Sequence, residues 1–318
     1  MYTRPVPPLQ ISWPQGHRFA FTVVDDTDGA TVDNVTPVYD LLTHLGMRTT
    51  KLVWMLPGDS NASFQGSSCA DPAYLAWVLS LQQQGFEIGF HNAAPVTSGR
   101  ERTCEAIAQF RAMFGPQPFI HCNHTGCREG IYWGDARLSG WRRPLYNLLT
   151  RGRRRGVFRG HLTGDPLFWG DLCQTHVRYV RNFVFDALNT LAVCPEMPYH
   201  DPAKPYVPFW FASTEGPTLR SFLRHFTVRS IDRLIAEGGL CIAYVHFAMG
   251  FAPNGQVNPK FRQCLEYIAS SNGWFAPASE VLDYLRQNAS PSERIIPPAK
   301  LRHLETRWLI SKLTKGTT

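Results

Sequence analysis

The chain lacks several features that would place it in a specialised class of protein. None of its 318 residues belongs to an uninterrupted run of 18 apolar residues, so no segment is expected to span a membrane. The first ten residues lack the apolar core of a secretory signal, and we therefore expect a cytoplasmic protein. Internal repeats and low-complexity tracts are also absent. With 44% hydrophobic and 18% charged residues, the chain can bury a large core.

The cysteine pattern is also poor in signals. There are eight cysteines and no Cys-x-x-Cys pair. A chain of this size needs no disulfide framework, so we expect most of them to be buried thiols. Cys122 and Cys127 lie close together in sequence, but one such pair without a well-spaced histidine pair is a poor signal for a structural zinc site.

Positive charge is concentrated in one segment. The formal net charge is +7, and residues 141–160 contain seven arginines and no acidic residue. This arginine-rich segment, residues 142–159, could be a solvated loop, a binding region for a phosphate-bearing substrate, or a contact for an anionic membrane surface. No recognisable nucleic-acid-binding module accompanies it, so we expect no specific nucleic-acid partner.

Short apolar runs alternate with amphipathic stretches, which indicates repeated β-α units and a mainly parallel sheet or barrel. Residues 126–217 interrupt this alternation, and we interpret them as a long elaboration with extended segments at 179–185 and 207–212. The predicted strands are 19–24, 50–56, 86–90, 118–121, 239–245 and 273–275, and the predicted helices are 36–45, 72–84, 100–114, 230–237, 258–270 and 279–287.

Three regions follow from this pattern: an N-terminal arm (1–15), a main domain (16–290) and a C-terminal tail (291–318). Residues 299–313 of the tail place apolar side chains on one helical face, with a largely basic face opposite. Such a helix could lie on an anionic membrane surface, or it could pack on the domain or on a partner chain. The oligomeric state is left open.

Polar residues follow several predicted strands at their carboxyl ends, where parallel barrels form active sites. Asp25 and Asp26 end the first strand, His91 follows the third, and His246 follows the strand at 239–245. His121 and His124 end the fourth. An Asp-rich turn or a hydrogen-bonded histidine is the ordinary interpretation of each site alone. Together, carboxylates and imidazoles from separate strand ends suit a divalent transition ion, which could activate water and polarise a carbonyl.

These segments resemble the motifs of NodB-like polysaccharide deacetylases (carbohydrate esterase family 4-like), as a divergent subgroup. VVDDTDG resembles their TFDDG motif, EIGFHN resembles their metal-histidine strand, CIAYVHF resembles their late catalytic-histidine motif, and GWFAPASEVLDYL resembles their closing strand and helix. The likeness covers about residues 15–290. It implies a distorted (β/α)7 barrel with a long insertion, and metal-dependent removal of an N- or O-acyl group, such as acetyl, from a sugar.

The resemblance also implies roles for individual residues. Asp25 matches the catalytic base, Asp26 and His91 match metal ligands, and His246 matches the histidine that protonates the leaving group. The ion would be zinc, or else cobalt, nickel, manganese or iron. We expect substrate or supporting contacts from a further set of residues: Asn92, Asn123, Arg128 and Tyr132.

Two family features are missing. The second metal histidine would stand at Pro95, which cannot bind metal, and the arginine-proline motif of the next strand is not evident. His124 or His121 could supply the third ligand, and we favour His124 because it lies further into the loop. The substrate would be a carbohydrate, and a cytoplasmic setting with the arginine-rich segment favours a lipid-linked or nucleotide-linked sugar. The alternatives are an amidohydrolase acting on a small non-sugar amide and an inactive carbohydrate-binding protein.

Overall fold

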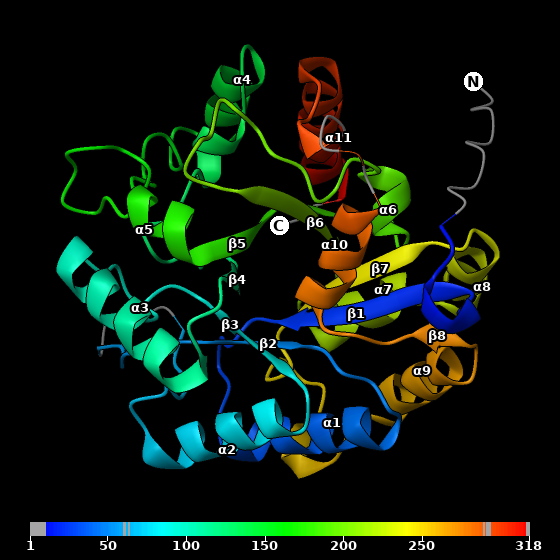
Figure 1. Ribbon diagram of the computed structural model, residues 1–318. Coiled ribbons are helices and arrows are strands. Elements are labelled where there is room, and N and C mark those ends of the chain that lie inside the picture. Colours follow the sequence, from blue (N-terminus) through cyan, green and yellow to red (C-terminus); the bar gives the residue numbers. More distant parts are fainter. Residues whose placement is uncertain (1–10, 60–61, 63, 289, 291–293, 316–318) are drawn as a thin grey trace.

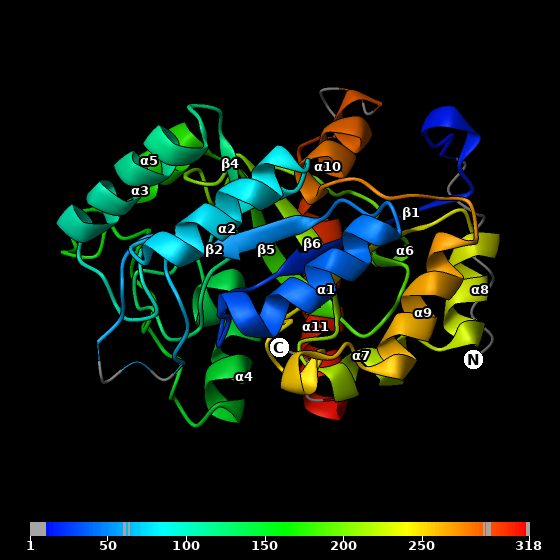
Figure 2. The same ribbon diagram turned by 90° about the horizontal axis from the view of Figure 1, so that it is seen from below.

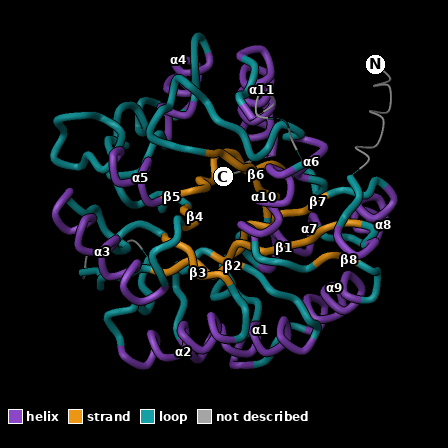
Figure 3. The backbone as a smooth tube through the Cα atoms, in the orientation of Figure 1, coloured by secondary structure: helices purple, strands orange, loops and turns teal. Residues whose placement is uncertain are grey.

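The computed structural model describes residues 11–59, 62, 64–288, 290 and 294–315, and it arranges them as a ring of strands surrounded by helices (Figures 1 and 3). Most of the predicted arm and parts of the predicted tail, residues 1–10, 291–293 and 316–318, lie outside this description. The strands are β1 (Phe19–Asp25), β2 (Thr50–Val53), β3 (Glu87–Phe90), β4 (Phe119–His121), β5 (Val177–Phe185), β6 (Phe209–Glu215), β7 (Leu240–Val245) and β8 (Gly273–Trp274). The longer helices are α1 (Val32–His44), α2 (Pro72–Gln83), α3 (Arg100–Phe114), α8 (Val228–Ala236), α9 (Pro259–Ala269), α10 (Ala278–Gln287) and α11 (Pro298–Lys315). Shorter helices are α4 (Arg142–Leu149), α5 (Gly170–His176), α6 (Thr190–Val193) and α7 (Leu219–His225), with 3-10 turns η1 (Pro14–Gly16), η2 (Gly134–Arg137) and η3 (Pro253–Gly255).

The strands form a closed parallel barrel. Neighbours pair in chain order from β2 to β7, and β1 closes the ring by pairing with both β7 and β2. Parallel neighbours require crossover connections, and the helices on the outside of the ring belong to these connections. In Figure 2, α1 and α2 lie next to each other beside β2, on the outside of the ring. The predicted distorted (β/α)7 barrel is thereby confirmed, and its long insertion is the connection between β4 and β5, which contains η2, α4 and α5.

The distortion lies at the seam beside β1. The first residues of β1, Phe19 and Ala20, pair with β8, whereas its last residues, Val24 and Asp25, pair with β2. Two strands thus share one edge of β1, and the ring is closed only toward the carboxyl end of that strand. The loop that carries the Asp-rich motif leaves the barrel from this closed end.

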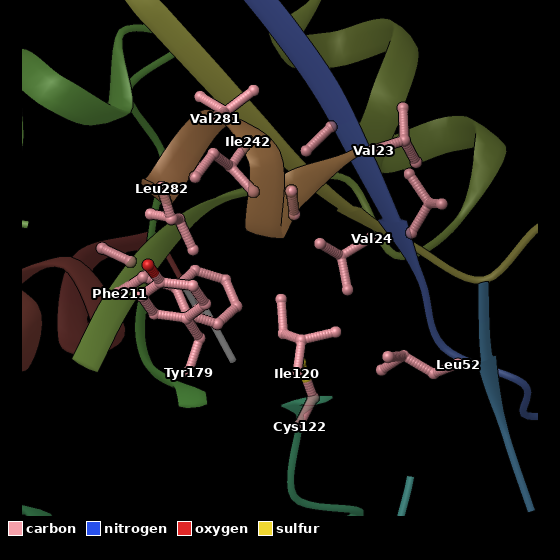
Figure 4. Close-up of a cluster of buried hydrophobic side chains, with 14 of the residues drawn as sticks. Val23, Val24, Leu52, Ile120, Cys122, Tyr179, Phe211, Ile242, Val281 and Leu282 are labelled. Carbon is pink, nitrogen blue, oxygen red and sulfur yellow. The ribbon is translucent and has the colours of Figure 1, made fainter. Parts of the chain in front are cut away.

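The barrel interior is apolar, and α10 closes its amino end. Side chains from β1, β2, β4, β6 and β7 meet Val281 and Leu282 of α10 in one cluster (Figure 4). The backbone of α10 is fixed at the starts of strands, since Ala278 donates to the hydroxyl of Thr50 and Ser279 donates to the carboxylate of Glu87. The opposite, carboxyl end of the barrel is therefore the end left for a functional site.

Two barrel strands come from the segment interpreted as an elaboration. The extended segments expected at 179–185 and 207–212 are β5 and β6, and they complete the ring between β4 and β7. They escape the β-α pattern because short helices and irregular segments, in place of one long amphipathic helix, connect them to the preceding strands. The first helix also starts earlier than expected, because Thr31 and Asn34 form a capping box.

The tail helix packs on the barrel. α11 lies beside α4 (Figure 1) and contacts β5, and its apolar face buries Leu304, Trp308 and Leu309. Arg142 of α4 donates to the hydroxyl of Thr306 at 2.7 Å. Packing on the domain is thus the arrangement observed for this helix, while membrane contact stays a prediction. Across the described residues, no helix has the length and apolarity needed to cross a membrane.

Candidate metal centre

The polar strand ends predicted from the sequence meet at the carboxyl end of the barrel. β1 leads into Asp26 and Asp28, β3 into His91, β4 into His124 and β7 into His246. A tight turn positions Asp28: the amide of Ala30 donates to the carbonyl of Thr27, and Gly29 between them has φ 74°, which glycine adopts without strain. α1 starts directly after this turn, so the loop is fixed at both ends.

Asp28 is the centre of the group, although the sequence analysis gave it no role. Its Oδ1 lies 2.8 Å from Nε2 of His124. Its Oδ2 lies 2.7 Å from Nε2 of His246 and 3.7 Å from Nε2 of His91. Burial alone would raise the pKa of Asp28, but the three histidines hold it well below its ordinary value. Asp28 is thus a buried carboxylate surrounded by imidazoles.

Several ligand-type atoms in this group have no hydrogen-bond partner. His91 Nε2 is buried and unsatisfied within the described part of the chain, whereas Asp28 Oδ1 and His124 Nε2 are buried 2.8 Å apart without forming a hydrogen bond of normal geometry. Donor atoms of Asp26, Asp28 and His91 lie within 4.8 Å of one another. Buried polar atoms are rarely left unpaired, so convergent unpaired donors need an explanation. A carboxylate with imidazole nitrogens suits a divalent transition ion, and this donor set fits such an ion.

The second ring nitrogen of His91 and of His124 is already used. Nδ1 of His91 lies 2.9 Å from the carbonyl oxygen of Cys122, which can only accept, so Nδ1 carries the proton. Nδ1 of His124 lies 3.3 Å from the sulfur of Cys127, whose thiol donates to the carbonyl of Ala94. In their neutral forms both rings therefore present an Nε2 lone pair, the form in which histidine binds metal.

The loops that carry these two histidines are tied together. Asn92 adopts φ 63°, and its side-chain oxygen accepts a hydrogen bond from the amide of His124 at 2.8 Å. Its side-chain amide donates to Glu129, whose other oxygen accepts from the amide of Ser98. Asn92, predicted as a substrate or supporting residue, therefore supports the histidine loops.

The surroundings of Gly126 and His121 bear on the choice of third ligand. A Cβ on Gly126 would lie 2.8 Å from Cε1 of His124 and 3.7 Å from the carbonyl oxygen of Pro95, so this glycine leaves room for the His124 ring beside Pro95. The ring nitrogens of His121 lie next to the carbonyl oxygen of Phe90 and the side-chain oxygen of Asn123, and burial lowers its pKa to about 4, so the neutral ring donates to one of these two acceptors. Of the two candidates, His124 is the one in the group.

Asp26 is held by an arginine that the sequence analysis missed. Its two oxygens lie 2.8 and 2.5 Å from the two terminal nitrogens of Arg181, a buried residue of β5. Burial would raise the pKa of Asp26, but Arg181 outweighs this effect and lowers it. Asp26 also lies 3.8 Å from Nε2 of His91. It is therefore next to the group around Asp28, but its carboxylate is paired with Arg181.

Asp25 forms a buried ion pair with Lys51 and lies outside the group around Asp28. One oxygen accepts from Nζ of Lys51 at 2.8 Å and from the hydroxyl of Tyr39 at 2.9 Å, and the other accepts from the amide of Phe247 at 2.8 Å. Asp25 and Lys51 are both fully buried. No contact between Asp25 and the three histidines is found among the described residues.

His246 is the most accessible of the histidines around Asp28. Its side chain is 12% exposed, against 1% for His91 and 3% for His124. Its Nδ1 lies 3.1 Å from the carbonyl oxygen of Pro217, and its Nε2 lies near Asp28 and the Tyr244 hydroxyl. Burial lowers the pKa of His246, but Asp28 outweighs it, so the pKa is raised and the ring favours its protonated form.

The other predicted supporting residues lie apart from the group. Both side-chain atoms of Asn123 bond to the backbone of Ile131. Arg128 is exposed, and its backbone amide bonds to Thr97. The ring of Tyr132 packs 4.4 Å from that of His161 within the insertion. These positions give no direct support to the substrate roles expected of them, which stay predictions.

Comparisons with known proteins give little further guidance. No protein-family model matches the chain, and no curated protein matches it. Among solved structures, a "putative polysaccharide deacetylase from Mycobacterium smegmatis" aligns with 92% of this chain and 98% of its own, at 14% sequence identity and a TM-score of 0.48. At this identity and TM-score the likeness carries no argument about the reaction, which has to be inferred from the residues of this chain.

Proposed function

We propose that this protein is a metal-dependent hydrolase that removes an N- or O-acyl group from a sugar. The observation that carries the proposal is the convergence of three buried ligand-type atoms, Asp28 Oδ1, His91 Nε2 and His124 Nε2, none of which makes a hydrogen bond of normal geometry, at the carboxyl end of the barrel. The substrate class rests on the motifs shared with NodB-like deacetylases. The roles of the aspartates, however, differ from those that the resemblance implies.

In this proposal Asp28, His91 and His124 hold the ion. A bound divalent ion would polarise the acyl carbonyl and lower the pKa of a water molecule. Two imidazoles and one carboxylate form an open set that leaves positions for water and substrate. Asp28 thereby takes the ligand role that the motif comparison gave to Asp26, and His124 takes the role vacant at Pro95.

Asp26 is then the proton acceptor. Arg181 holds both of its oxygens and keeps the carboxylate ionised and oriented, while Asp26 borders His91. A positioned carboxylate next to the reacting water can remove its proton in the transition state. Asp25, matched to the base by the motif, is bonded to Lys51, Tyr39 and Phe247 and, unlike Asp26, contacts none of the three histidines in the described part of the chain, so we assign it a structural role.

His246 is the proton donor. Contact with Asp28 favours the imidazolium, and Pro217 fixes the ring through Nδ1, so Nε2–H can be passed to the departing amine or hydroxyl. A general base has to be ionised and a general acid has to be protonated at the same pH. Asp26 and His246 favour these two states.

The test is acetate release from acetylated sugars by purified protein, before and after chelation. We expect release to stop on metal removal and to return with zinc, cobalt, nickel, manganese or iron. His246→Asn should lower the rate by about 10²-fold or more without loss of metal. If the wild-type protein binds none of these ions, the hydrolase and the alternative amidohydrolase are both rejected, and a binding protein remains. Release of acyl groups only from small non-sugar amides would instead favour the amidohydrolase.

A further inference from the structure

A cationic pocket lies among the elements of the insertion and α11, and the proposed chemistry does not use it. The cavity measures about 440 Å³ and lies among η2, α4, α11 and the loop that follows α4. We call it the arginine pocket. Its charged lining residues are Arg137, Arg151, Arg153, Arg154 and Lys312, and no acidic residue lines it. Five cations around one cavity repel one another unless an anion lies between them.

Arg137 is the fixed base of this pocket. It is 3% exposed, and its guanidinium lies between the rings of Trp133 and Trp308, at 4.0 and 4.1 Å. Its Nη1 donates to the carbonyl of Asn182. No carboxylate lies within ion-pair distance of it in the described part of the chain. A buried, rigidly stacked guanidinium without a carboxylate is costly unless a ligand supplies the anion.

Lys312 and Arg154 add positive charge to the same pocket as Arg137. Burial, with further lowering by Arg137 and Arg154, brings the pKa of Lys312 down to about 8 despite the opposing effect of Glu215. An anion in the pocket would reverse this shift. The loop that carries Arg154 is held from outside, because the amide of Gly156 donates to Asp135 at 3.1 Å. The cations are therefore presented by a folded loop.

A neighbouring hollow shows the ordinary arrangement. Arg143 and Arg155 line a second cavity outside α4, together with Asp135 and with Arg151, which lines both cavities. There Arg143 bonds to Asp135 at 3.0 Å, so the chain supplies its own counter-charge. The arginine pocket differs from this second cavity because no acidic residue lines it. This contrast separates a pocket suited to an anion from a basic surface in general.

Two residues at the pocket directly follow residues of the candidate metal centre in the sequence. Thr125 lines the pocket and directly follows His124, so the two are one residue apart. Asn182, which accepts from Arg137, directly follows Arg181, the partner of Asp26. A ligand group in the pocket would thus lie beside two of the loops and strands that hold the centre.

We propose that the arginine pocket binds the phosphate or diphosphate group of the substrate, leaving the acylated sugar attached to it at the metal centre. This inference rests on the proposed function, because it takes the bound anion to be part of the substrate. Binding of the anion itself can be tested without any turnover. Planar guanidinium groups suit phosphate oxygens, and a cavity of this size lies within the range of small-ligand sites.

The test is calorimetric titration of the full-length protein with inorganic pyrophosphate at about physiological salt, where nonspecific charge attraction is screened. The metal-free Asp28→Asn variant serves as host, so that chelation cannot imitate binding. We expect saturable binding that weakens about tenfold in Arg154→Ala and in Lys312→Met. Arg155→Ala is the matched control, since it removes the same charge one residue away, outside the pocket, and should change affinity less than about twofold.

Two further titrants distinguish the sources of the group. Uridine diphosphate represents a nucleotide-linked sugar, and geranyl diphosphate in detergent represents a lipid-linked sugar. Stronger binding of either than of pyrophosphate, lost in Arg154→Ala, supports the pocket and names the source. Using two variants from different elements keeps a folding defect in one of them from deciding the result.

The proposal is overturned if pyrophosphate does not bind saturably, or if Arg155→Ala weakens binding as much as Arg154→Ala. Preferential binding of a single-stranded oligonucleotide would also overturn it, by assigning the cations to nucleic acid. Absence of metal from the wild-type protein would reject the proposed hydrolase but leave these binding results unaffected, so the two failures can be told apart.

Discussion

Asp25 and Asp28 stand three residues apart on the same strand end, and their surroundings are opposite. Both oxygens of Asp25 are satisfied, by Lys51, Tyr39 and the amide of Phe247. Asp28 keeps an unsatisfied oxygen although three histidines lie within 3.7 Å of its carboxylate. Each carboxylate is buried, so burial alone does not distinguish them.

The difference lies in which partner completes each group. The Asp25 site is complete within the protein, as expected of a group that stabilises the fold. The Asp28 site brings together carboxylate and imidazole atoms that bind metal but do not hydrogen-bond fully to one another. This is expected of a group that is completed by a ligand. Motif order points to Asp25 and Asp26, whereas the buried oxygen without a hydrogen bond belongs to Asp28.

The largest effect on stability should follow from Asp25→Asn. Removing one partner of a buried ion pair leaves Lys51 charged without its carboxylate, which costs about 3–5 kcal/mol of unfolding free energy. Denaturant unfolding of metal-free protein would measure this cost, and Lys51→Met alone should be similarly harmful. The double variant Asp25→Asn with Lys51→Met should recover much of the loss. If Asp28→Asn destabilises the metal-free protein as much as Asp25→Asn, the contrast between the two sites is wrong.

Arg181→Met tests Asp26, whose carboxylate is ion-paired like that of Asp25 but lies close to a histidine like that of Asp28. Without the guanidinium, burial raises the pKa of Asp26, so the acidic limb of the rate profile should move to higher pH. We expect kcat/KM at neutral pH to fall about 10²-fold to 10³-fold. Metal content should persist, which atomic emission would show. Loss of the ion in this variant would mean that Arg181 positions a ligand and not a base.

Glu129 is a fourth buried carboxylate, which accepts hydrogen bonds from Asn92 and Ser98 and has no cation paired with it in the described part of the chain. Burial raises its pKa from 4.5 to about 7. Between these values the folded protein holds a proton that the unfolded chain has released, so Glu129 makes stability fall as pH rises, on the order of 3 kcal/mol across the window. Glu129→Gln should therefore flatten unfolding free energy against pH from about 5 to 7.5. Equal slopes in both proteins would show that Glu129 does not titrate there.

Cys127→Ala should have the smallest of these effects. The sulfur accepts from Nδ1 of His124, and its loss frees the ring to rotate, which should weaken metal affinity about 10-fold to 100-fold. Competition with a chromogenic chelator measures this change. Cys173→Ala is a suitable control, because Cys173 is also a buried thiol but lies in α5. Equal affinity in both variants would remove Cys127 from the support of the centre.

Much of the fold could be predicted because its signals are local. The α3 helix over residues 100–114 and the start of β1 at Phe19 follow from periodicity, caps and apolar runs. β5 and β6 were recognised only as extended segments, since irregular loops separate them from the other strands. Their place in the barrel depends on pairing with β4 and β7, which no local pattern encodes.

The site was predicted in outline but not in its roles. His91, His124 and His246 were found because each follows a strand, a rule that fold geometry supplies. The roles proposed for Asp28 and Arg181 depend on tertiary contacts: Arg181 meets Asp26 across 155 residues of sequence. The D-x-D spacing of Asp26 and Asp28 was visible, but only the turn at Gly29 brings Asp28 to the histidines.

The central claim is that Asp28, and not Asp26, holds the ion. The most direct measurement is metal content per chain for Asp26→Asn and Asp28→Asn, each purified, stripped and reloaded beside the wild type. We predict about one ion per chain in the wild type and in Asp26→Asn, and almost none in Asp28→Asn. Loss of the ion from Asp26→Asn with retention in Asp28→Asn would contradict the account and restore the assignment that the motif implies.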